Sequence, residues 1–100
     1  MQGQYDKAIE DYNKSIALDP KRGEFYKMRA LAYIQTRQPD RTIEDCNRAI
    51  SFDPNDAGSY SYRGRAFLQK GHYDNAIEDC TKAISIDSND ELAYSTRGRA

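Results

Sequence analysis

Apolar side chains recur along the chain at the spacing of one face of an α-helix. In the segment 74–86, five of them stand at relative positions 0, 1, 4, 7 and 8, which fall on one side of a helix. They are Ala76, Ile77, Cys80, Ala83 and Ile84. The polar residues at 87–90 are typical of a chain reversal. The pattern therefore predicts an amphipathic helix that ends before residue 87.

A second helix is predicted just before it, over residues 57–70. This stretch has no proline, and its large apolar residues fall mostly at helical spacings. Gly71 follows, and glycine readily adopts the left-handed conformation that ends a helix. Asp74 then places a carboxylate near the positive end of the next helix, where it is favourable. The two segments predict a helix, a short turn and an antiparallel helix.

The same pattern recurs with a period of 34 residues. Segments 23–56 and 57–90 carry the same amino acid at 15 of 34 positions, and the register continues into residues 1–22 and 91–100. A fixed period of this length indicates stacked supersecondary units rather than a closed globule. We therefore predict one all-α repeat domain over 1–100, with a half repeat at 1–22 that holds a second helix over 5–18. Two full repeats at 23–56 and 57–90 follow, and 91–100 is part of a first helix.

The repeat at 23–56 departs from its neighbour in one turn. Arg37 stands where the other copy has Gly71, so this turn is expected to be slightly strained or to use another geometry. Pro39 follows and is tolerated at the first position of a helix. Pro20 and Pro54 each come after a second helix, which proline cannot continue.

The overall composition gives little reason to expect nucleic acid or a membrane as a partner. The 100 residues include 15 Lys and Arg against 16 Asp and Glu, so no global basic field exists. No apolar run approaches the ~20 residues of a membrane span, and the first residues lack the apolar segment of a signal peptide. We expect a soluble, cytoplasmic protein.

The repeat resembles the tetratricopeptide repeat. Matching residues occupy the early aromatic position (Tyr26, Tyr60, Tyr94), the small residue four further on (Ala30, Gly64, Gly98), the next aromatic (Tyr33, Phe67), the glycine–tyrosine turn (Gly3-Tyr5, Gly71-Tyr73), the small residues of the second helix (Ala8, Ala76, Ala49, Ala83) and the closing proline (Pro20, Pro54). The resemblance covers the whole chain. It implies a right-handed superhelical solenoid of antiparallel pairs, helix A and helix B. Small residues would let helices approach closely, and tyrosines would fill the gaps between repeats while keeping a polar tip for a partner.

The resemblance also implies a concave groove lined by helix A, which would bind a protein or peptide partner. The surface expected to face it mixes aromatic, aliphatic and basic groups, and suits an extended or helical peptide with apolar anchors and some acidic groups. The ligand-groove residues are Lys27, Met28, Leu31, Gln35, Tyr62, Arg65, Gln69, Thr96 and Arg99, with Glu24, Ser61 and Leu92 beside them. The alternative is solvated surface in a spacer repeat.

Some members of this family grip the C-terminal carboxylate of heat-shock chaperones with lysine, asparagine and arginine side chains on three successive A helices. In the first alignment, only Lys27 matches. The other four positions hold Leu31, Tyr62, Leu92 and Thr96. Starting one repeat earlier also fails. We therefore predict no such clamp.

Arg29, Arg63 and Arg97 form a column at one position of helix A. They could bind phosphate, but each full repeat also carries an acidic pair on helix B, at 44–45 and 78–79. Bidentate pairing between arginine and carboxylate would hold the two helices in register, and we favour this structural role.

No motif indicates catalysis, a cofactor or a metal site. Cys46 and Cys80 lie one repeat apart, on the order of 10 Å by helix packing, whereas a disulfide needs α-carbons within ~7 Å. We predict two reduced, buried packing residues. His72 is the only histidine, and no phosphate loop, zinc signature or nucleophile elbow is present. The chain is therefore not expected to be an enzyme.

Three functions remain open. The first is a protein-interaction scaffold. The second is a spacer or self-assembling array, because residue 100 falls two register steps short of where residue 1 of another copy would resume. A head-to-tail homo-oligomer would then supply the missing half repeats, a contact that builds rings or filaments. The third is the non-catalytic repeat region of a larger enzyme. RNA binding fits poorly with the 34-residue period and slightly acidic composition.

Overall fold

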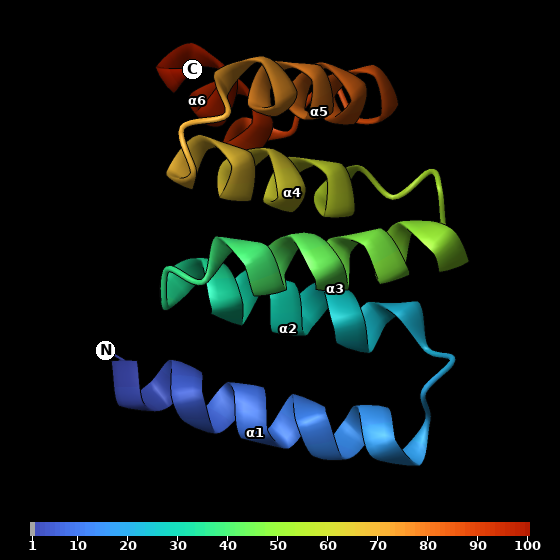
Figure 1. The fold of residues 1–100 in the computed structure, drawn as a ribbon. Helices are drawn as coiled ribbons and strands as arrows, with labels where there is room; N and C mark the ends of the chain where they lie inside the picture. The colour runs from blue at the N-terminus through green and yellow to red at the C-terminus, as the bar shows by residue number, and fades with distance from the viewer. Residues whose placement is uncertain (1) are drawn as a thin grey trace.

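A computed structural model describes residues 2–100 as a stack of α-helices (Figure 1). Their bounds are α1 Gln2–Leu18, α2 Gly23–Gln35, α3 Pro39–Phe52, α4 Ala57–Gln69, α5 Tyr73–Ile86 and α6 Glu91–Arg99. The predicted all-helical solenoid is confirmed. The helix predicted over 5–18 begins earlier, at Gln2, and the helix predicted over 57–70 ends one residue sooner.

The helices form two layers. Each helix packs against the next one in sequence, and the A helices α2, α4 and α6 also contact one another in series. Among the described residues, the B helices α1, α3 and α5 do not contact one another. In Figure 1, α2 lies behind α3 and α6 lies behind α5, while the stack rises from α1 at the bottom. The A helices therefore form a continuous layer whose outer face can meet a ligand.

Small side chains set the close packing of the stack. Ala30, Ala76 and Ala83 are fully buried, as the sequence predicts. At Gly64, a β-carbon would lie 2.7 Å from the Sγ atom of Cys80, so α4 and α5 can approach this closely only with glycine there. Cys80 and Cys46 are buried free thiols, which confirms their predicted packing role.

Two tyrosines close the junctions between repeats. The Tyr26 hydroxyl donates to the Pro20 carbonyl oxygen at 2.8 Å, and the Tyr60 hydroxyl donates to that of Pro54 at 2.9 Å. The expectation that this polar tip stays available to a partner is wrong for Tyr26, which is buried, whereas the hydroxyl of Tyr60 remains at the surface. Each hydroxyl instead fixes the turn that enters its own helix.

The arginine column joins three helices at a time. Arg29 on α2 donates two hydrogen bonds of 2.7 Å to the Asp45 carboxylate on α3, and a third of 2.8 Å to Asn13 on α1. This arrangement confirms the predicted bidentate pairing across the helix pair. The bond to the preceding repeat was not predicted.

Arg63 repeats this geometry one unit later. It donates to Asp79 twice at 2.8 Å and to Asn47 at 2.9 Å. Asp45 and Asp79 are only 3% and 6% exposed. Hydrogen bonding to these carboxylates raises the pKa of both arginines, against the opposing effect of burial. We call each set of three side chains an arginine staple.

The turn inside each full repeat contains one residue with a positive φ angle, but that residue differs between the two repeats. Gly71 has φ of 78°, and Arg37 has φ of 54°. The turn at Arg37 thus keeps the glycine geometry and carries the predicted strain, because a left-handed conformation costs a residue with a β-carbon roughly 1–2 kcal/mol.

Removal of one arginine staple should strongly destabilise the fold. Arg63→Met leaves the Asp79 carboxylate buried without its partner, a defect that costs about 3 kcal/mol or more. Urea unfolding followed by circular dichroism measures this loss. Arg48→Met is the control, because Arg48 is exposed, lies over the Tyr26 ring and forms no ion pair within residues 2–100, and it should cost under about 1 kcal/mol. Equal losses in the two variants would contradict the structural role of the staple.

Replacement of Arg37 by glycine should stabilise the chain. The variant removes about 1–2 kcal/mol of left-handed strain from the folded state. Glycine also stabilises the unfolded state through its conformational entropy, which costs about 0.4–1 kcal/mol. The free energy of unfolding should therefore rise by about 0.5–1 kcal/mol. Gly71→Arg is the reciprocal control and should destabilise by a similar amount, since a β-carbon there meets nothing within 4 Å. Thermal unfolding measures both. A lower melting temperature for Arg37→Gly would show that the residue's contacts outweigh its strain.

Candidate functional site

The layer of A helices carries a groove made of two adjoining hollows. We call the larger one, about 680 Å³, the tyrosine hollow; it is lined by α2, α4, Tyr62 and the turns that precede α4 and α6. The smaller one, about 310 Å³, is the arginine hollow, which lies between α2, α4 and the start of α6. Leu31 and Leu92 line both hollows. A bound segment could therefore pass from one hollow to the other over these two leucines.

The wall of the tyrosine hollow is fixed by polar contacts. Lys27 Nζ lies 3.2 Å from both carboxylate oxygens of Asp56. Asp56 also caps α4, because its carboxylate accepts from the Gly58 backbone N–H at 3.2 Å and from the Ser59 hydroxyl at 3.0 Å. Burial raises the pKa of the Tyr62 phenol, with Asp56 adding to the rise and Lys27 opposing it. The Tyr62 ring thus offers a neutral, partly buried surface.

The arginine hollow combines an aliphatic surface with two arginines that form no ion pair within residues 2–100. It is lined by Leu31, Ile34, Gln35, Arg37, Arg65, Gln69 and Leu92. The Gln69 Nε2 atom donates to the Ile34 carbonyl oxygen at 3.2 Å, which braces α4 against α2. Burial, and then the neighbouring Arg99 guanidinium, lower the pKa of Arg65. No carboxylate lines this hollow.

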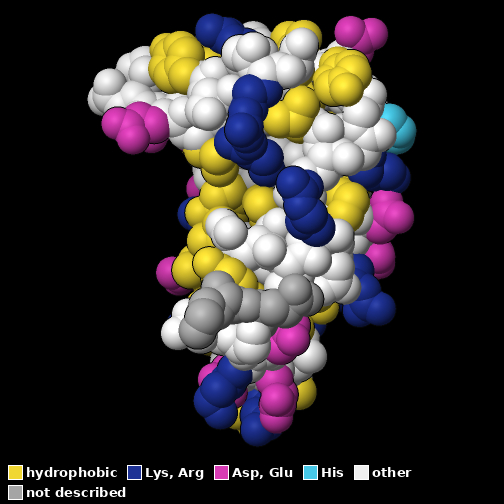
Figure 2. All heavy atoms as spheres, turned by 90° about the vertical axis from the view of Figure 1, so that its left-hand side faces the viewer, with side chains coloured by type: hydrophobic (Ala, Val, Ile, Leu, Met, Phe, Trp, Pro, Cys, Tyr) yellow, Lys and Arg dark blue, Asp and Glu magenta, His cyan; other side chains and the backbone are white. Residues whose placement is uncertain are grey.

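One side of the stack displays cationic side chains beside hydrophobic ones. Figure 2 views the side that carries the α2–α3 and α4–α5 turns, and it shows lysine or arginine side chains in a diagonal row. Hydrophobic side chains lie on both sides of that row. The surface can therefore offer charge and apolar area together.

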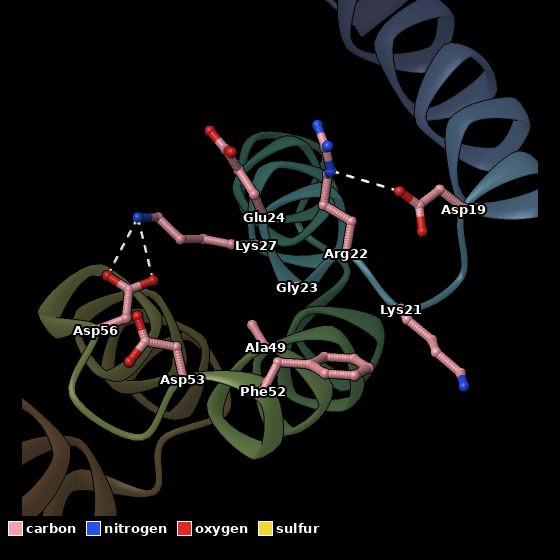
Figure 3. A pocket seen from close by; sticks show the side chains of 10 residues that line it. All are labelled: Asp19, Lys21, Arg22, Gly23, Glu24, Lys27, Ala49, Phe52, Asp53 and Asp56. Carbon is pink, nitrogen blue, oxygen red and sulfur yellow. Dashed lines mark hydrogen bonds and ion pairs between the residues drawn. The ribbon is translucent and has the colours of Figure 1, made fainter.

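A third hollow, about 550 Å³, lies beside Lys27, where α2 begins and α3 ends (Figure 3). Its charges are largely compensated within the protein. Arg22 Nε lies 3.5 Å from Asp19 Oδ2, and Lys27 pairs with Asp56. Within residues 2–100, no group of three or more histidine, cysteine, aspartate or glutamate side chains could hold a metal ion. Acidic and basic side chains both line this hollow, so it does not present charge of a single sign to a ligand.

Most of the predicted groove residues lie at the two hollows. Lys27, Leu31 and Tyr62 line the tyrosine hollow with Ser61 and Leu92, and Gln35, Arg65 and Gln69 line the arginine hollow. Arg99 is exposed and lies near enough to Arg65 to affect its pKa. Met28 is partly buried but lines neither hollow, and Glu24 lines the third hollow instead. Ligand binding by these residues stays a prediction.

The expected exposure of Thr96 is wrong. Thr96 is fully buried, and its hydroxyl oxygen has no hydrogen-bond partner among the described residues. Ser61, which the sequence places in the groove, is 1% exposed. In the same columns of the repeat, Tyr62 and Lys27 line the tyrosine hollow. Thr96 therefore cannot contact a ligand without rearrangement.

Sequence reasoning missed Ile34, Arg37 and the turn carboxylates. Ile34 and Arg37 line the arginine hollow, and Asp56 and Asp90 line the tyrosine hollow. Arg37 could have been found from its substitution for glycine in the turn. The turns before α4 and α6 begin the A helices, so their aspartates could have been placed at the rim of the groove.

Sequence profiles identify the family. Profiles described as "Tetratricopeptide repeat" match residues 23–56 and 57–90, and one described as "TPR repeat" matches residues 1–36. The chain therefore belongs to the tetratricopeptide repeat (TPR) family, whose fold is generally a protein-interaction module rather than a catalytic one. No curated protein matches the sequence.

Solved TPR domains share the fold. The Arabidopsis OM64 TPR domain has a TM-score of 0.92 at 25% identity, over 97% of this chain and 80% of that one. The first TPR of Spaghetti (RPAP3) bound to HSP90 peptide SRMEEVD has a TM-score of 0.90 at 28% identity, over 98% and 78%. The second TPR domain of human RPAP3 in complex with HSP70 peptide SGPTIEEVD has a TM-score of 0.88 at 26% identity, over 97% and 81%.

Two of these neighbours hold chaperone peptides, which bears on the predicted absence of a carboxylate clamp. Lys27 is the one side chain at a matching position, and in this structure it is paired with Asp56. Thr96, at another of those positions, is buried. The absence of a clamp stays a prediction.

Within residues 2–100, no helix has the length and apolar character needed to cross a bilayer.

Proposed function

We propose that this chain is a protein-interaction scaffold that binds a segment of a partner protein in the groove of α2, α4 and α6. The observation that carries the proposal is the pair of hollows joined by Leu31 and Leu92. Solved relatives of this fold hold peptides, which supports a peptide as the class of ligand. An apolar side chain of the partner would sit against the shared leucines, beside the ring of Tyr62.

The groove is suited to binding because its walls are already fixed. The Lys27–Asp56 ion pair joins α2 to the turn that precedes α4, and the hydrogen bond from the Gln69 side chain to the Ile34 carbonyl oxygen joins α4 to α2. A preorganised surface loses less conformational entropy when a ligand binds. Aliphatic and aromatic groups partly exposed within a fixed frame are the usual anchors of such interfaces.

Substitution of the shared leucine should weaken peptide binding. A peptide selected on the chain from a random display library should bind Leu31→Ser at least about tenfold more weakly, because central apolar anchors contribute the most to affinity. Fluorescence anisotropy measures the dissociation constant. Ile77→Ser is the control, since Ile77 is an exposed aliphatic residue on α5, away from both hollows. Selected peptides that bind both variants equally well would contradict the groove as the binding site.

A specific observation favours head-to-tail association of the 100-residue chain as a second activity. In each arginine staple, the arginine pairs with the aspartate sixteen positions later. Arg97 and Asp11 occupy the corresponding positions in the outer repeats. Within residues 2–100, the Arg97 guanidinium and the Asp11 carboxylate have no ion-pair partner. Tyr94 beside Arg97 is 45% exposed. A second copy would supply the missing partner at each position.

Charge exchange tests this association. The mass of the chain in light scattering should rise above 11.5 kDa between micromolar and millimolar concentration. Asp11→Arg alone and Arg97→Asp alone should each stay monomeric, because like charges then face each other. An equal mixture of the two variants should associate again, since each contact between one variant and the other joins opposite charges. A wild-type mass that stays constant over the whole range would contradict the proposal.

A further inference from the structure

The arginine hollow gathers positive charge that the protein does not neutralise. Elsewhere in the stack, the partly buried guanidinium groups of Arg29 and Arg63 each hold a carboxylate through two hydrogen bonds. Arg65 is also partly buried, but it forms no ion pair within residues 2–100. The same holds for Arg37 and Arg99. A partly buried cation without a counter-ion is an unfavourable arrangement in the free protein.

The backbone conformation of Arg37 is a second, separate reason to expect a ligand site in the arginine hollow. Its backbone has φ of 54°, whereas the equivalent turn in the next repeat uses Gly71. A strained residue where a neighbouring repeat uses glycine is the kind of feature that marks a functional position. The residue lines the arginine hollow, so the strained turn places a second cation at the same site as Arg65.

The other residues that line the arginine hollow indicate which apolar group of the ligand accompanies its negative charge. Leu31, Ile34 and Leu92 supply aliphatic surface directly beside the two arginines. A free inorganic anion or a nucleic-acid backbone would leave this apolar surface unused. An acidic residue that is followed or preceded by an aliphatic residue would use both parts of the lining.

We propose that the arginine hollow binds an acidic side chain within a partner segment, next to an aliphatic side chain that packs on Leu31, Ile34 and Leu92. This inference rests on the proposed groove function and specifies the chemistry of its ligand. The carboxylate accepts hydrogen bonds from Arg65 and Arg37, and Arg99 adds to the local positive field. The ligand group is an internal Asp or Glu side chain, so a free C-terminus is not required.

Three probes test the proposal. The first is a fluorescent peptide of alternating leucine and glutamate with both ends blocked, so that it has no terminal carboxylate. The second replaces each glutamate with glutamine, and the third is a labelled oligouridylate. Wild-type chain should bind the glutamate peptide about tenfold more tightly than the glutamine peptide, because charge-assisted hydrogen bonds to arginine form only with the carboxylates.

Variants then assign that preference to the hollow. Arg65→Gln should reduce the tenfold preference to about twofold or less. Arg37→Gly should weaken binding of the glutamate peptide several-fold even though it is expected to raise the melting temperature, which separates a binding role from a structural one. Lys14→Gln removes the same charge from α1, where Lys14 is 72% exposed, and should leave the preference unchanged.

Several results would overturn the inference. They are equal binding of the glutamate and glutamine peptides, an unchanged preference in Arg65→Gln, no binding of the glutamate peptide up to millimolar concentration, or arginine-dependent binding of oligouridylate in place of the peptide. The proposed groove function is judged separately, by the display-selected peptides and Leu31→Ser. If those peptides depend on Leu31 but not on Arg65, the groove function stands and the acidic ligand is wrong.

Discussion

The rest of the structure depends on the arginine staple. A stack of short helices has few long-range constraints, and its small side chains allow neighbouring helices to slide. Arg29 and Arg63 remove this freedom, because each guanidinium uses its planar donors to hold a carboxylate on the following helix and an amide on the preceding one. The same geometry at both positions fixes three consecutive helices at one register. The burial of Asp45 and Asp79 makes this constraint strict, since a shifted helix would leave a buried charge unpaired.

The staple also determines where the groove can form. It ties α2 and α4 to the B helices on either side, so the opposite face of these two A helices is left for other contacts. On that face the repeats differ in sequence: one column reads Leu31, Arg65 and Arg99. Constant residues therefore hold the frame, while variable residues on the exposed face set the chemistry of the two hollows. This division explains how a uniform fold can carry a specific ligand preference.

Much of the frame could be predicted from sequence, because it depends on short-range spacing repeated every 34 residues. The apolar face at 76–84, the turn glycine at 71 and the arginine–carboxylate pair all follow from residues within one unit. The bonds to Asn13 and Asn47 could not, since they join different repeats and the next residue in that column is Thr81. Thr96 was misplaced because its column was judged by position alone. That column does not share one environment: Tyr62 lines the tyrosine hollow, Met28 lines neither hollow, and Thr96 is fully buried.

The outer face of the A helices is the proposed binding surface. The most direct measurement is an NMR titration of the isotope-labelled chain with a display-selected peptide, which reports on all helices at once. The largest shift changes should cluster on α2, α4 and α6 around Leu31, Tyr62 and Leu92, with little change on the outer faces of α3 and α5. Changes centred on α3 and α5, with the groove unperturbed, would contradict it.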